Sequence, residues 1–446
     1  MKKITLSLMC TLLLSSSYAA DSLDEAFRDG SFSGHIRAFY IDRNWQGDIK
    51  KTDYSAFAVG VDLHYQTAEF LGFSVGIGIY SDNDFGLNSS DPKKVHKSLL
   101  GDDGDSYSFV GEAFIKYRYQ NTTFKAGRQK LNTPLAAADD ARMIPNLFEA
   151  YLLTNSDIKD TTLIAAYVTK IAPGTFFNQY RGGTALALTA GYGANEDASI
   201  GRFEDLGYYA VGENSNGVTL GAVIYKGIKN LTLQAWDYYA HDILNAIYLQ
   251  ADLKWNCLIS ENIKPFAALQ YINQKDVGDN LAAKALNKKE VDADYFGIKI
   301  GANYDQFTFY GAFSSTSSNK DAAVNGGIIT PWGGMPAFTQ GMVTRHQFFA
   351  DTNSWKVAGS YKWSDFDLNL KTVLYYASYD VGKDNAYSPD HSWTAKEAGF
   401  DFIYYPKNIK NLQLRFRGNF PRSFYENSQG QDLGWNEYRF IVNYNF

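Results

Sequence analysis

The sequence predicts an all-β protein, a transmembrane antiparallel β-barrel of about 18 strands. Three observations predict it. Apolar and polar residues alternate with a period of two along many segments, short and long turn signals alternate between those segments, and no segment after residue 19 holds the run of about 18 apolar residues that a helical span needs. Such alternation arises when one strand face meets lipid and the other meets a polar lumen. A soluble β-sandwich also alternates, but its polar face is rarely so basic in adjoining segments.

The first 19 residues have the three parts of a secretory signal peptide. Two lysines precede an apolar run over 4–14, and the small residues 17–19 form an A-x-A-like cleavage site. The apolar run is too short to cross the roughly 30 Å hydrocarbon core of a membrane. We therefore expect residues 1–19 to be a removable signal peptide and residues 20–446 to form a single outer-membrane barrel domain.

Composition and charge exclude several classes of protein. The formal net charge is -6 at pH 7, and no block of basic residues resembles those of nucleic-acid-binding proteins, so nucleic acid is not an expected partner. Aromatic residues make up 16% of the chain although its mean hydropathy is only -0.31, a combination that suits strands with a single apolar face. Of the 2 cysteines, Cys10 belongs to the expected signal peptide, and Cys257 alone cannot form a disulfide framework.

The expected strands are separated by two kinds of connection. Short ones, such as 120–121 and 305–306, alternate with long polar ones, such as 81–105 and 314–353. Bacterial outer-membrane barrels have short periplasmic turns and longer extracellular loops, so we assign the two kinds to the two sides of the membrane. The connections leave these strands: 33–43, 53–66, 69–80, 106–120, 122–129, 147–155, 161–170, 217–226, 231–240, 243–255, 262–272, 292–304, 307–314, 354–363, 366–379, 394–405, 411–419 and 434–446.

Two further segments are not counted as wall strands. Segment 204–212 also has strand character, but counting it would break the alternation of turn sizes, so we place it in a loop. Residues 21–30 contain Leu23, Ala26 and Phe27 at helical spacing, which indicates a short periplasmic helix before the first strand.

The alternation assigns side chains to the two faces of individual strands. Large apolar residues are expected on the lipid face of three segments: Tyr107, Phe109, Ile115, Tyr117 and Tyr119 in 107–119; Phe366, Leu368, Leu370 and Leu374 in 366–374; and Tyr438, Phe440, Val442, Tyr444 and Phe446 in 435–446, where only Ile441 breaks the pattern. The residues between them are expected to face the lumen.

No motif indicates catalysis or a bound metal or cofactor. The six histidines are scattered without an H-x-x-x-H spacing, and neither a G-x-S-x-G elbow nor a Gly-rich phosphate loop occurs in the sequence. We therefore expect no catalytic residue, no metal ligand and no cofactor, and we do not expect an enzyme. Barrel hydrolases assemble their sites from distant residues, so an outer-membrane hydrolase stays open as the least favoured alternative.

Basic residues recur on the faces expected to line the lumen. Strand 411–419 neighbours 434–446, and closure places the latter beside 33–43, so their arginines can lie on one wall. Charge clustered within low-dielectric walls draws carboxylates inward, and a planar guanidinium pairs bidentately with a carboxylate. Alternatively, these cations only solvate the lumen and balance Glu112, Asp367 and Glu437. The predicted basic row is Arg37, Lys116, Arg118, Lys125, Lys371, Arg415, Arg417 and Arg439.

One long loop, 130–146, differs in composition from the others. It is less polar, has alanines that allow close packing, and holds Asp139, Asp140 and Arg142 at its centre. A hydrated external loop does not need that composition, whereas a loop folded into the barrel does. We therefore expect this third extracellular loop to fold inward and to narrow the channel with those three charged residues.

The most specific run in the chain extends from Gly127-Arg128-Gln129-Lys130-Leu131-Asn132-Thr133-Pro134 to Phe148-Glu149-Ala150-Tyr151. It resembles the third-loop signature of the OprD family of substrate-specific porins. The segments 27–40, 225–239 and 331–334 are similar to other segments of that family, so the resemblance covers nearly all of residues 20–446.

The resemblance implies a set of roles. Family members are monomeric or weakly trimeric barrels of about 18 strands in the Gram-negative outer membrane, and they pass small carboxylate-bearing nutrients by diffusion. They use an inward-folded third loop, aided by the seventh, and a ladder of lumen arginines and lysines. These roles carry over to Asp139, Asp140 and Arg142, to the loop containing Trp332, and to the arginines of the basic row.

The expected function is a passive, partly selective outer-membrane channel for small water-soluble solutes, with a bias toward carboxylates such as amino acids, peptides and organic acids. The expected partners are outer-membrane lipid, those solutes, and the barrel-assembly machinery, which the strand ending on Phe446 would engage. A barrel that serves as an adhesin or surface structure has the same sequence pattern, so it stays an alternative, and ion conductance separates the two.

Overall fold

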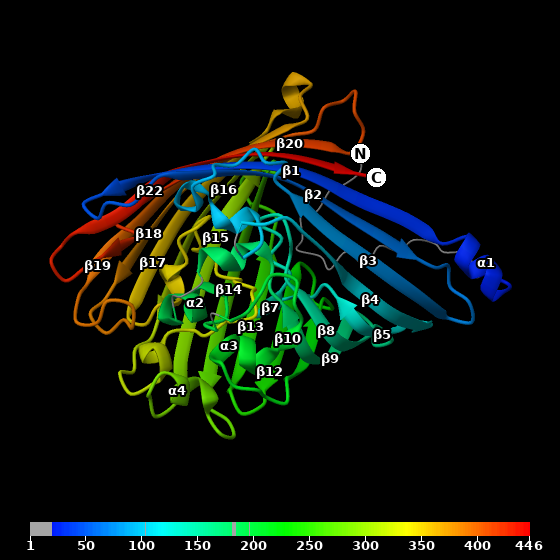
Figure 1. The fold of residues 1–446 in the computed structure, drawn as a ribbon, viewed down its shortest axis with the longest axis horizontal. Coiled ribbons are helices and arrows are strands. Elements are labelled where there is room, and N and C mark those ends of the chain that lie inside the picture. The colour runs from blue at the N-terminus through cyan, green and yellow to red at the C-terminus, as the bar shows by residue number, and fades with distance from the viewer. Residues whose placement is uncertain (1–19, 103, 181–183, 196) are drawn as a thin grey trace.

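The computed structural model describes residues 20–446 with the exceptions of 103, 181–183 and 196, so the signal peptide expected over 1–19 lies outside the described residues. Within the described part, 18 long antiparallel strands form one closed barrel (Figure 1). Strands that follow one another in this wall are neighbours, and β1 (Ser31–Gly47) closes the barrel by pairing with β22 (Asp432–Asn445). The predicted fold class is confirmed.

Each expected strand overlaps one strand of the wall. The others, in chain order, are β2 (Tyr54–Gln66), β3 (Phe73–Asn83), β4 (Tyr107–Tyr119), β5 (Thr122–Gln129), β8 (Leu147–Asn155), β9 (Thr161–Ala172), β11 (Val218–Tyr225), β12 (Leu231–Ala240), β13 (Leu244–Lys254), β14 (Ile263–Lys275), β15 (Asp292–Tyr304), β16 (Phe307–Thr316), β17 (Thr352–Lys362), β18 (Leu370–Val381), β19 (Trp393–Tyr404) and β20 (Leu412–Arg422). Four two-residue strands lie in the loops: β6 (Asn132–Thr133), β7 (Ala136–Ala137), β10 (Glu204–Asp205) and β21 (Tyr425–Glu426).

The helices are short. They precede β1 or lie in the connections between strands, so none of those described is part of the barrel wall. The helix expected within 21–30 is present as α1 (Leu23–Arg28), capped by Ser22 Oγ, which accepts a hydrogen bond from the Glu25 amide at 3.2 Å. Segment 204–212 contains β10 followed by a helix, so it is not a wall strand. The remaining helices are α2 (Thr184–Ala190), α3 (Leu206–Val211), α4 (Leu281–Ala285) and the 3₁₀ turns η1 (Pro92–Lys94), η2 (Lys97–Leu99), η3 (Thr175–Gln179), η4 (Ala323–Gly326), η5 (His346–Phe348) and η6 (Trp363–Phe366). None of the helices described is long and apolar enough to cross a membrane.

Side chains on the wall strands alternate between an outer face and an interior face. In β12, Trp236, Tyr238 and Ala240 are buried, whereas Asp237 and Tyr239 between them are exposed. Successive Cβ atoms of a strand point to opposite sides of the sheet, which produces this alternation. The exposed apolar side chains form the surface that meets hydrocarbon, and the buried ones pack against loops inside the barrel.

A β-bulge in β4 overturns the faces expected for the first half of that strand. Gly111 is an extra residue that has no partner on β3. Because the period is two, one extra residue moves every side chain before it to the opposite face. Tyr107 and Phe109 therefore pack against a buried interior cluster rather than lipid, and Val110 is exposed in their place. Beyond the bulge, Ile115 is exposed as expected.

Two strands begin several residues later than expected. β3 begins at Phe73, after a turn over 67–72, and β18 begins at Leu370. The 3₁₀ turn η6 precedes β18, and it ends at Asp367, which adopts a left-handed conformation with φ 57°. Phe366 and Leu368 therefore lie in a turn and not on the lipid face of a strand, because the i to i+3 bonds of a 3₁₀ turn replace those of a strand ladder.

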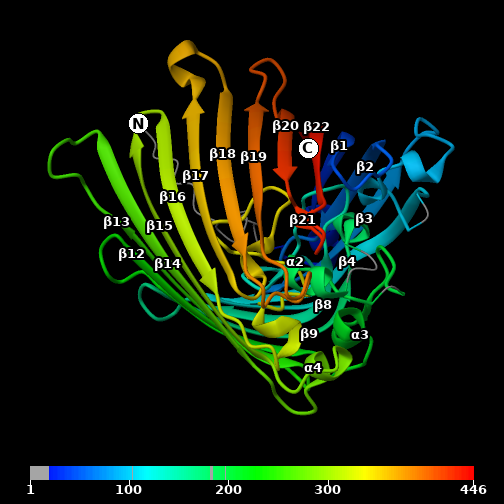
Figure 2. The ribbon, with the colours of Figure 1, turned by 90° about the vertical axis from the view of Figure 1, so that its left-hand side faces the viewer.

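Long loops occupy much of the barrel interior. We number the extracellular loops in chain order, and loop 2 (84–106), loop 3 (130–146), loop 4 (173–217) and loop 7 (317–351) contribute many of the buried side chains. Figure 2 shows α3 of loop 4, and α4 of the connection between β14 and β15, at one end of the strands, with the turn between β17 and β18 at the other end. The segments that enter the barrel therefore come from the side with long connections, and they position the candidate site.

Candidate functional site in the barrel interior

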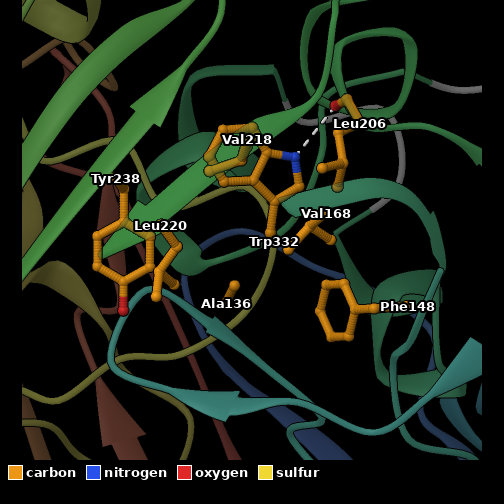
Figure 3. Close-up of a pocket in the computed structure, with 8 residues that line it drawn as sticks. All are labelled: Ala136, Phe148, Val168, Leu206, Val218, Leu220, Tyr238 and Trp332. Atoms are coloured by element: carbon orange, nitrogen blue, oxygen red, sulfur yellow. Dashed lines mark hydrogen bonds between the residues drawn. The ribbon is translucent and has the colours of Figure 1, made fainter. Parts of the chain in front are cut away.

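Loop 3 is fixed on one side by apolar packing. Leu135 is buried, and its backbone amide donates to the Tyr238 hydroxyl of β12 at 3.2 Å. The indole of Trp332, from loop 7, donates to the Leu206 carbonyl of loop 4 at 3.1 Å. These groups surround a small apolar gap (Figure 3), which is lined by Ala136, Phe148, Val168, Leu206, Val218, Leu220, Tyr238 and Trp332.

Loop 7 supports loop 3 directly. The Ala137 amide donates to the Trp332 carbonyl at 3.1 Å, and the Gly334 amide donates to Asp139 Oδ2 at 3.2 Å. Arg345 Nη1 lies 3.9 Å from the same Asp139 oxygen. Burial raises the pKa of the Asp139 carboxyl against the opposing effect of Arg345. Asp139 therefore connects loop 3 to loop 7, whereas the sequence assigned it to the narrowing of the channel.

Charge fixes the other side of loop 3. Arg37 of β1 donates to Asp140 Oδ1 at 2.7 Å and also to the carbonyl of Arg142. Burial would raise the pKa of Asp140, but the Arg37 guanidinium outweighs burial and holds that pKa below its ordinary value. The centre of loop 3 is thereby tied to a strand on the far side of the barrel from Tyr238.

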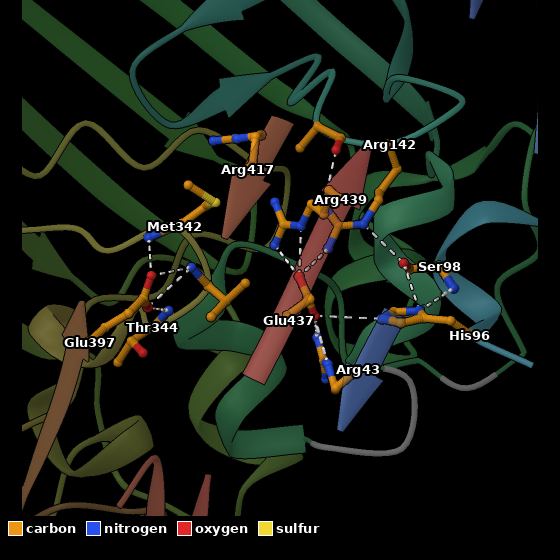
Figure 4. A network of polar contacts seen from close by, with 12 residues as sticks. Arg43, His96, Ser98, Arg142, Met342, Thr344, Glu397, Arg417, Glu437 and Arg439 are labelled. Carbon is orange, nitrogen blue, oxygen red and sulfur yellow. Dashed lines mark hydrogen bonds and ion pairs between the residues drawn. The ribbon is translucent and has the colours of Figure 1, made fainter. Parts of the chain in front are cut away.

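Glu437 of β22 lies at the centre of a buried cationic cluster (Figure 4). Arg43 and Arg439 form ion pairs with its carboxylate, Arg142 Nη2 lies 3.8 Å from it, and His96 Nε2 lies 3.7 Å from it. Burial lowers the pKa of His96 to about 3, so this histidine is neutral at pH 7. The positive charge around Glu437 therefore comes from the three arginines.

Arg142 retains an unused hydrogen-bond donor. Its Nε donates to Ser98 Oγ at 2.9 Å and its Nη1 donates to the Ala141 carbonyl at 3.0 Å, whereas Nη2 has no hydrogen-bond partner among the described residues. Burial, followed by the nearby charge of Arg439, lowers the pKa of Arg142 well below its ordinary value. A buried donor without an acceptor is costly, so an anion that approached Arg142 would be favoured.

Asp401 of β19 is shared by two arginines of β20. Arg415 Nε donates to Asp401 Oδ1 at 2.8 Å, and Arg417 Nε lies 3.2 Å from Oδ2. Arg417 is also the direct cross-strand partner of Arg439, so the two clusters are continuous. The side chains of Arg415 and Arg417 are 28% and 16% exposed, whereas Arg439 is buried. Together the Glu437 and Asp401 clusters hold four arginines of the wall, Arg142 of loop 3 and two carboxylates, so positive charge is in excess here.

Lys371 extends this wall by one strand. Ile403 of β19 pairs with Lys371 on one side and with Arg415 on the other. The alternation of β18 places Lys371 on the same interior face as the buried Ala377 and Tyr379. The predicted basic row therefore continues across β18, β20, β22 and β1, and β19 contributes the carboxylate that Arg415 and Arg417 share.

The remaining predicted cations lie on another part of the wall. Lys116 Nζ lies 3.6 Å from Glu69, and Arg118 Nη2 lies 2.6 Å from the same side chain. Lys125 is the cross-strand partner of Lys116, and its Nζ lies 3.6 Å from the centroid of the Phe114 ring. Glu69 comes from the turn that precedes β3, so the structure places these cations away from the Glu437 and Asp401 clusters.

The carboxylates that the sequence offered as balancing charges have different positions. Glu437 is the centre of one cluster, and Glu112 is a buried acceptor for the Tyr80 hydroxyl at 2.7 Å. Asp367 does not face the lumen, because it lies in the turn before β18, is exposed, and pairs with Lys407. The expectation for Asp367 was wrong for the same reason as that for Phe366: η6 ends the strand alternation there.

Sequence reasoning missed two arginines of the site. Arg43 continues the interior face of β1 after Arg37, Phe39 and Ile41, so the period of two carries a signal for it. Arg345 lies in loop 7, where no alternation exists. Its position between loop 3 and loop 4 depends on the path of the folded loops, and no local pattern indicates it.

The sequence matches the model of the OprD family, described as outer membrane porins, over residues 25–446. The chain belongs to the OprD family. The match covers every strand of the barrel and both clusters of arginines, so this OprD-family chain is an outer-membrane porin of a Gram-negative bacterium, with small solutes and membrane lipid as its partners. No curated protein matches the sequence.

Solved structures of OprD-family porins share the fold. OccK9 (OpdG) of Pseudomonas aeruginosa superposes with a TM-score of 0.74 at 18% identity, and OccAB3 of Acinetobacter baumannii with 0.74 at 17% identity. OpdK of Pseudomonas aeruginosa, described with vanillate, gives 0.73 at 16% identity. Each comparison covers 94% of this chain and 99% of the other. At these identities the likeness concerns the barrel and not the solute.

Proposed function

We propose that this OprD-family porin passes small water-soluble solutes by passive diffusion and favours those that carry a carboxylate. The observation that supports the preference is the excess of arginine over carboxylate on the wall formed by β19, β20, β22 and β1. Arg415 and Arg417 are partly exposed, so they can offer bidentate donors to a passing carboxylate. The buried arginines behind them add to the attractive field.

Loop 3 supplies the narrow part of the path in this proposal. Asp140 and Arg142 hold the loop against the cationic wall, and Leu135 holds it against the opposite wall. Asp139 acts indirectly, by joining loop 3 to loop 7. The bound vanillate named for the OpdK structure, an aromatic carboxylate, is the kind of solute that such a wall would accept.

Three further expectations belong to the proposal. Residues 1–19 direct export and are then removed, the strand that ends on Phe446 is recognised by the barrel-assembly machinery, and the porin is a monomer or a weak trimer. The adhesin and hydrolase alternatives receive no support from the family match, which describes a porin.

Liposome swelling tests the proposal. Proteoliposomes are diluted into isotonic amino acids, dicarboxylates or neutral sugars of similar size, and we expect the carboxylates to enter faster than the sugars. The triple variant R415Q, R417Q and R439Q should reduce the ratio of the two rates about tenfold, the effect of roughly 1.4 kcal/mol.

A matched control removes the same charge elsewhere. Lys226, Lys229 and Lys410 are exposed in periplasmic turns, and their joint replacement by glutamine should leave the carboxylate-to-sugar ratio unchanged. If both triple variants keep the ratio of the wild type, the cationic wall has no guiding role. An absence of swelling with every solute would remove the channel function as well.

A further inference from the structure

We propose that the backbone amides of Met342, Val343 and Thr344 in loop 7 form a carboxylate-binding site, and that Glu397 of β19 fills this site and thereby latches loop 7 inside the barrel. Free carboxylates would compete with Glu397 for the same amides. The latch rests on contacts within the chain, and its link to transport rests on the proposed function.

The amides surround the Glu397 carboxylate from one side. Met342 N donates to Oε1 at 2.7 Å and Thr344 N donates to Oε2 at 2.7 Å, while Val343 N lies 3.3 Å from both oxygens. The Tyr375 hydroxyl also donates to Oε1. Consecutive amides that point at one anion form a nest, a concave backbone arrangement that binds anions in many proteins.

The carboxylate is held without a cationic partner. Glu397 is fully buried, and among the described residues no lysine or arginine forms an ion pair with it. The four donors supply its direct hydrogen bonds, and the ammonium group of Lys356 is close enough to interact with its charge. Bonds to an ionised acceptor, which are stronger than neutral ones, therefore connect loop 7 to β19. Without the carboxylate, the amides of Val343 and Thr344 would lose their acceptor, and the Met342 amide would keep only the Tyr375 hydroxyl, at 3.2 Å.

Gly341 shows that the backbone is shaped around the carboxylate. Its amide donates to the Thr344 carbonyl at 3.1 Å, so the chain curls tightly at this point. A Cβ at position 341 would lie 2.6 Å from Glu397 Oε2 and 2.9 Å from the Tyr379 hydroxyl. Any side chain larger than that of glycine would therefore occupy the place of the carboxylate.

The wall also contacts this part of loop 7 through backbone carbonyls and through one hydroxyl pair, Ser314 Oγ of β16 and Thr339 Oγ1, at 2.6 Å. Lys356 Nζ donates to the Gln340 carbonyl at 2.6 Å, and the Tyr379 hydroxyl donates to the Thr339 carbonyl at 3.0 Å. Each of these side chains makes one bond, or two in the case of Tyr379, whereas Glu397 receives several donors from three successive residues. We infer that Glu397 makes the largest contribution to holding this segment against the wall.

The latch lies beside the cationic wall. Glu397 and Asp401 are four residues apart on the same face of β19, a distance of about 13 Å along a strand. Figure 4 shows the Glu397 group and Arg417 in one view of the interior. A solute carboxylate that reaches Arg417 thus has a second carboxylate site nearby, and occupying it would release loop 7.

Limited trypsin cleavage tests the latch without any transport assay. Arg345 follows the nest, is buried, and donates to the Ala190 carbonyl at 2.9 Å, so cleavage after it requires loop 7 to open. In detergent-solubilised porin, E397A should raise the rate of cleavage at Arg345 at least about tenfold, because cleavage follows the population of the open form. Mass spectrometry of the fragments identifies the bond.

Chemical rescue identifies the site as one for carboxylates. Sodium formate at about 100 mM should slow the cleavage of E397A, whereas formamide, a neutral molecule of similar size, should not. G341A should open the loop like E397A but show no formate rescue, since its methyl group fills the site. E112A removes another buried interior glutamate and should leave cleavage at Arg345 unchanged.

Each result decides the proposal. Cleavage of E397A at the wild-type rate, or equal protection by formate and formamide, would overturn it. If E397A fails to fold, the isosteric E397Q replaces it, with an intermediate rate expected, and a wild-type rate in E397Q would also overturn the latch. In planar bilayers E397A should show larger and noisier single-channel currents than the wild type. If the wild type conducts no current, the proposed channel function is wrong, but the proteolysis result still tests the latch.

Discussion

The two sides of loop 3 are held by different kinds of interaction. Toward β12, Leu135 packs in an apolar region and donates one hydrogen bond to Tyr238. Toward β1 and β22, Asp140 and Arg142 bind Arg37 and Glu437 through charge. The apolar side depends on buried area and close packing, whereas the cationic side depends on ionisation and, where it is exposed, on salt. The same loop should therefore respond differently to cavities, pH and ionic strength according to which side is perturbed.

The largest effect is expected on the cationic side. Glu437→Ala leaves Arg43, Arg142 and Arg439 buried without their shared carboxylate. Removing one partner of a buried ionic network typically costs about 3–5 kcal/mol. We expect urea-induced unfolding, followed by tryptophan fluorescence in detergent, to show a loss of this size in the free energy of unfolding. A loss below about 1 kcal/mol would mean that the cluster is hydrated and not buried.

A cavity should destabilise the apolar side of loop 3. Leu135→Ala removes a buried side chain at the contact between loop 3 and β12. Large-to-small substitutions of this kind cost about 2–5 kcal/mol, according to how far the surroundings relax. In the same urea assay the loss should be equal at low and high salt. A loss that shrinks strongly with added salt would show that loop 3 is held by charge on both sides.

Acidification should loosen loop 7. Burial lowers the pKa of His346 to about 4, so the docked loop keeps this histidine neutral while a released loop would bind a proton near pH 6.5. The stability that comes from neutral His346 is complete above about pH 6.5 and decreases as the pH falls toward 4, a loss on the order of 3 kcal/mol.

His346→Gln is the matched control for that prediction. His346 Nε2 donates to the Phe424 carbonyl, and a glutamine amide can keep this bond without titrating. Between pH 7 and pH 4.5 the melting temperature of the wild type should therefore fall more than that of the variant. Equal decreases in the two proteins would assign the pH response to other groups, such as His96.

The smallest effect is expected for the half-exposed ion pair. Asp140 is 46% exposed and Arg37 is 12% exposed, so Asp140→Asn should cost no more than about 1 kcal/mol. The Arg37 guanidinium holds the pKa of Asp140 below its ordinary value, so this contribution is present above about pH 4 and is lost at lower pH. The cost of the substitution should also decrease in 1 M salt. A cost that is independent of salt would mean that solvent does not reach this pair.

The wall of the barrel was predictable because a period of two is a local property. Each strand is long enough to show the alternation, and the order of the strands then places Arg417 beside Arg439. The faces of Tyr107 and Phe109 were not predictable. The single extra residue Gly111 reverses the alternation, and nothing in the local sequence marks it as a bulge. The prediction for Phe366 was wrong for a related reason. Apolar and polar residues can alternate over a few positions in a 3₁₀ turn as well as in a strand.

The candidate site was predictable from alternation where it lies on strands, and from composition for the charged residues of loop 3. Arg415 and Asp401 face each other because their strands are neighbours and both side chains point inward. His96 and Arg345 reach the same interior through loops 2 and 7, whose paths depend on packing with distant parts of the chain. In the described part of the chain, at least six of the eight predicted cations form ion pairs with carboxylates, and of those carboxylates only Glu437 was among the balancing charges named from the sequence. The spacing of residues along one strand does not give the distance between side chains of different segments.

The reversal potential of single channels in a potassium chloride gradient tests the central claim most directly. If the four arginines of the wall, together with Arg142 of loop 3, guide anions, the wild type should be anion-selective, and the R415Q, R417Q and R439Q variant should shift the reversal potential toward zero or to cation selectivity. A cation-selective wild type, or a reversal potential that the triple variant does not change, would contradict the account.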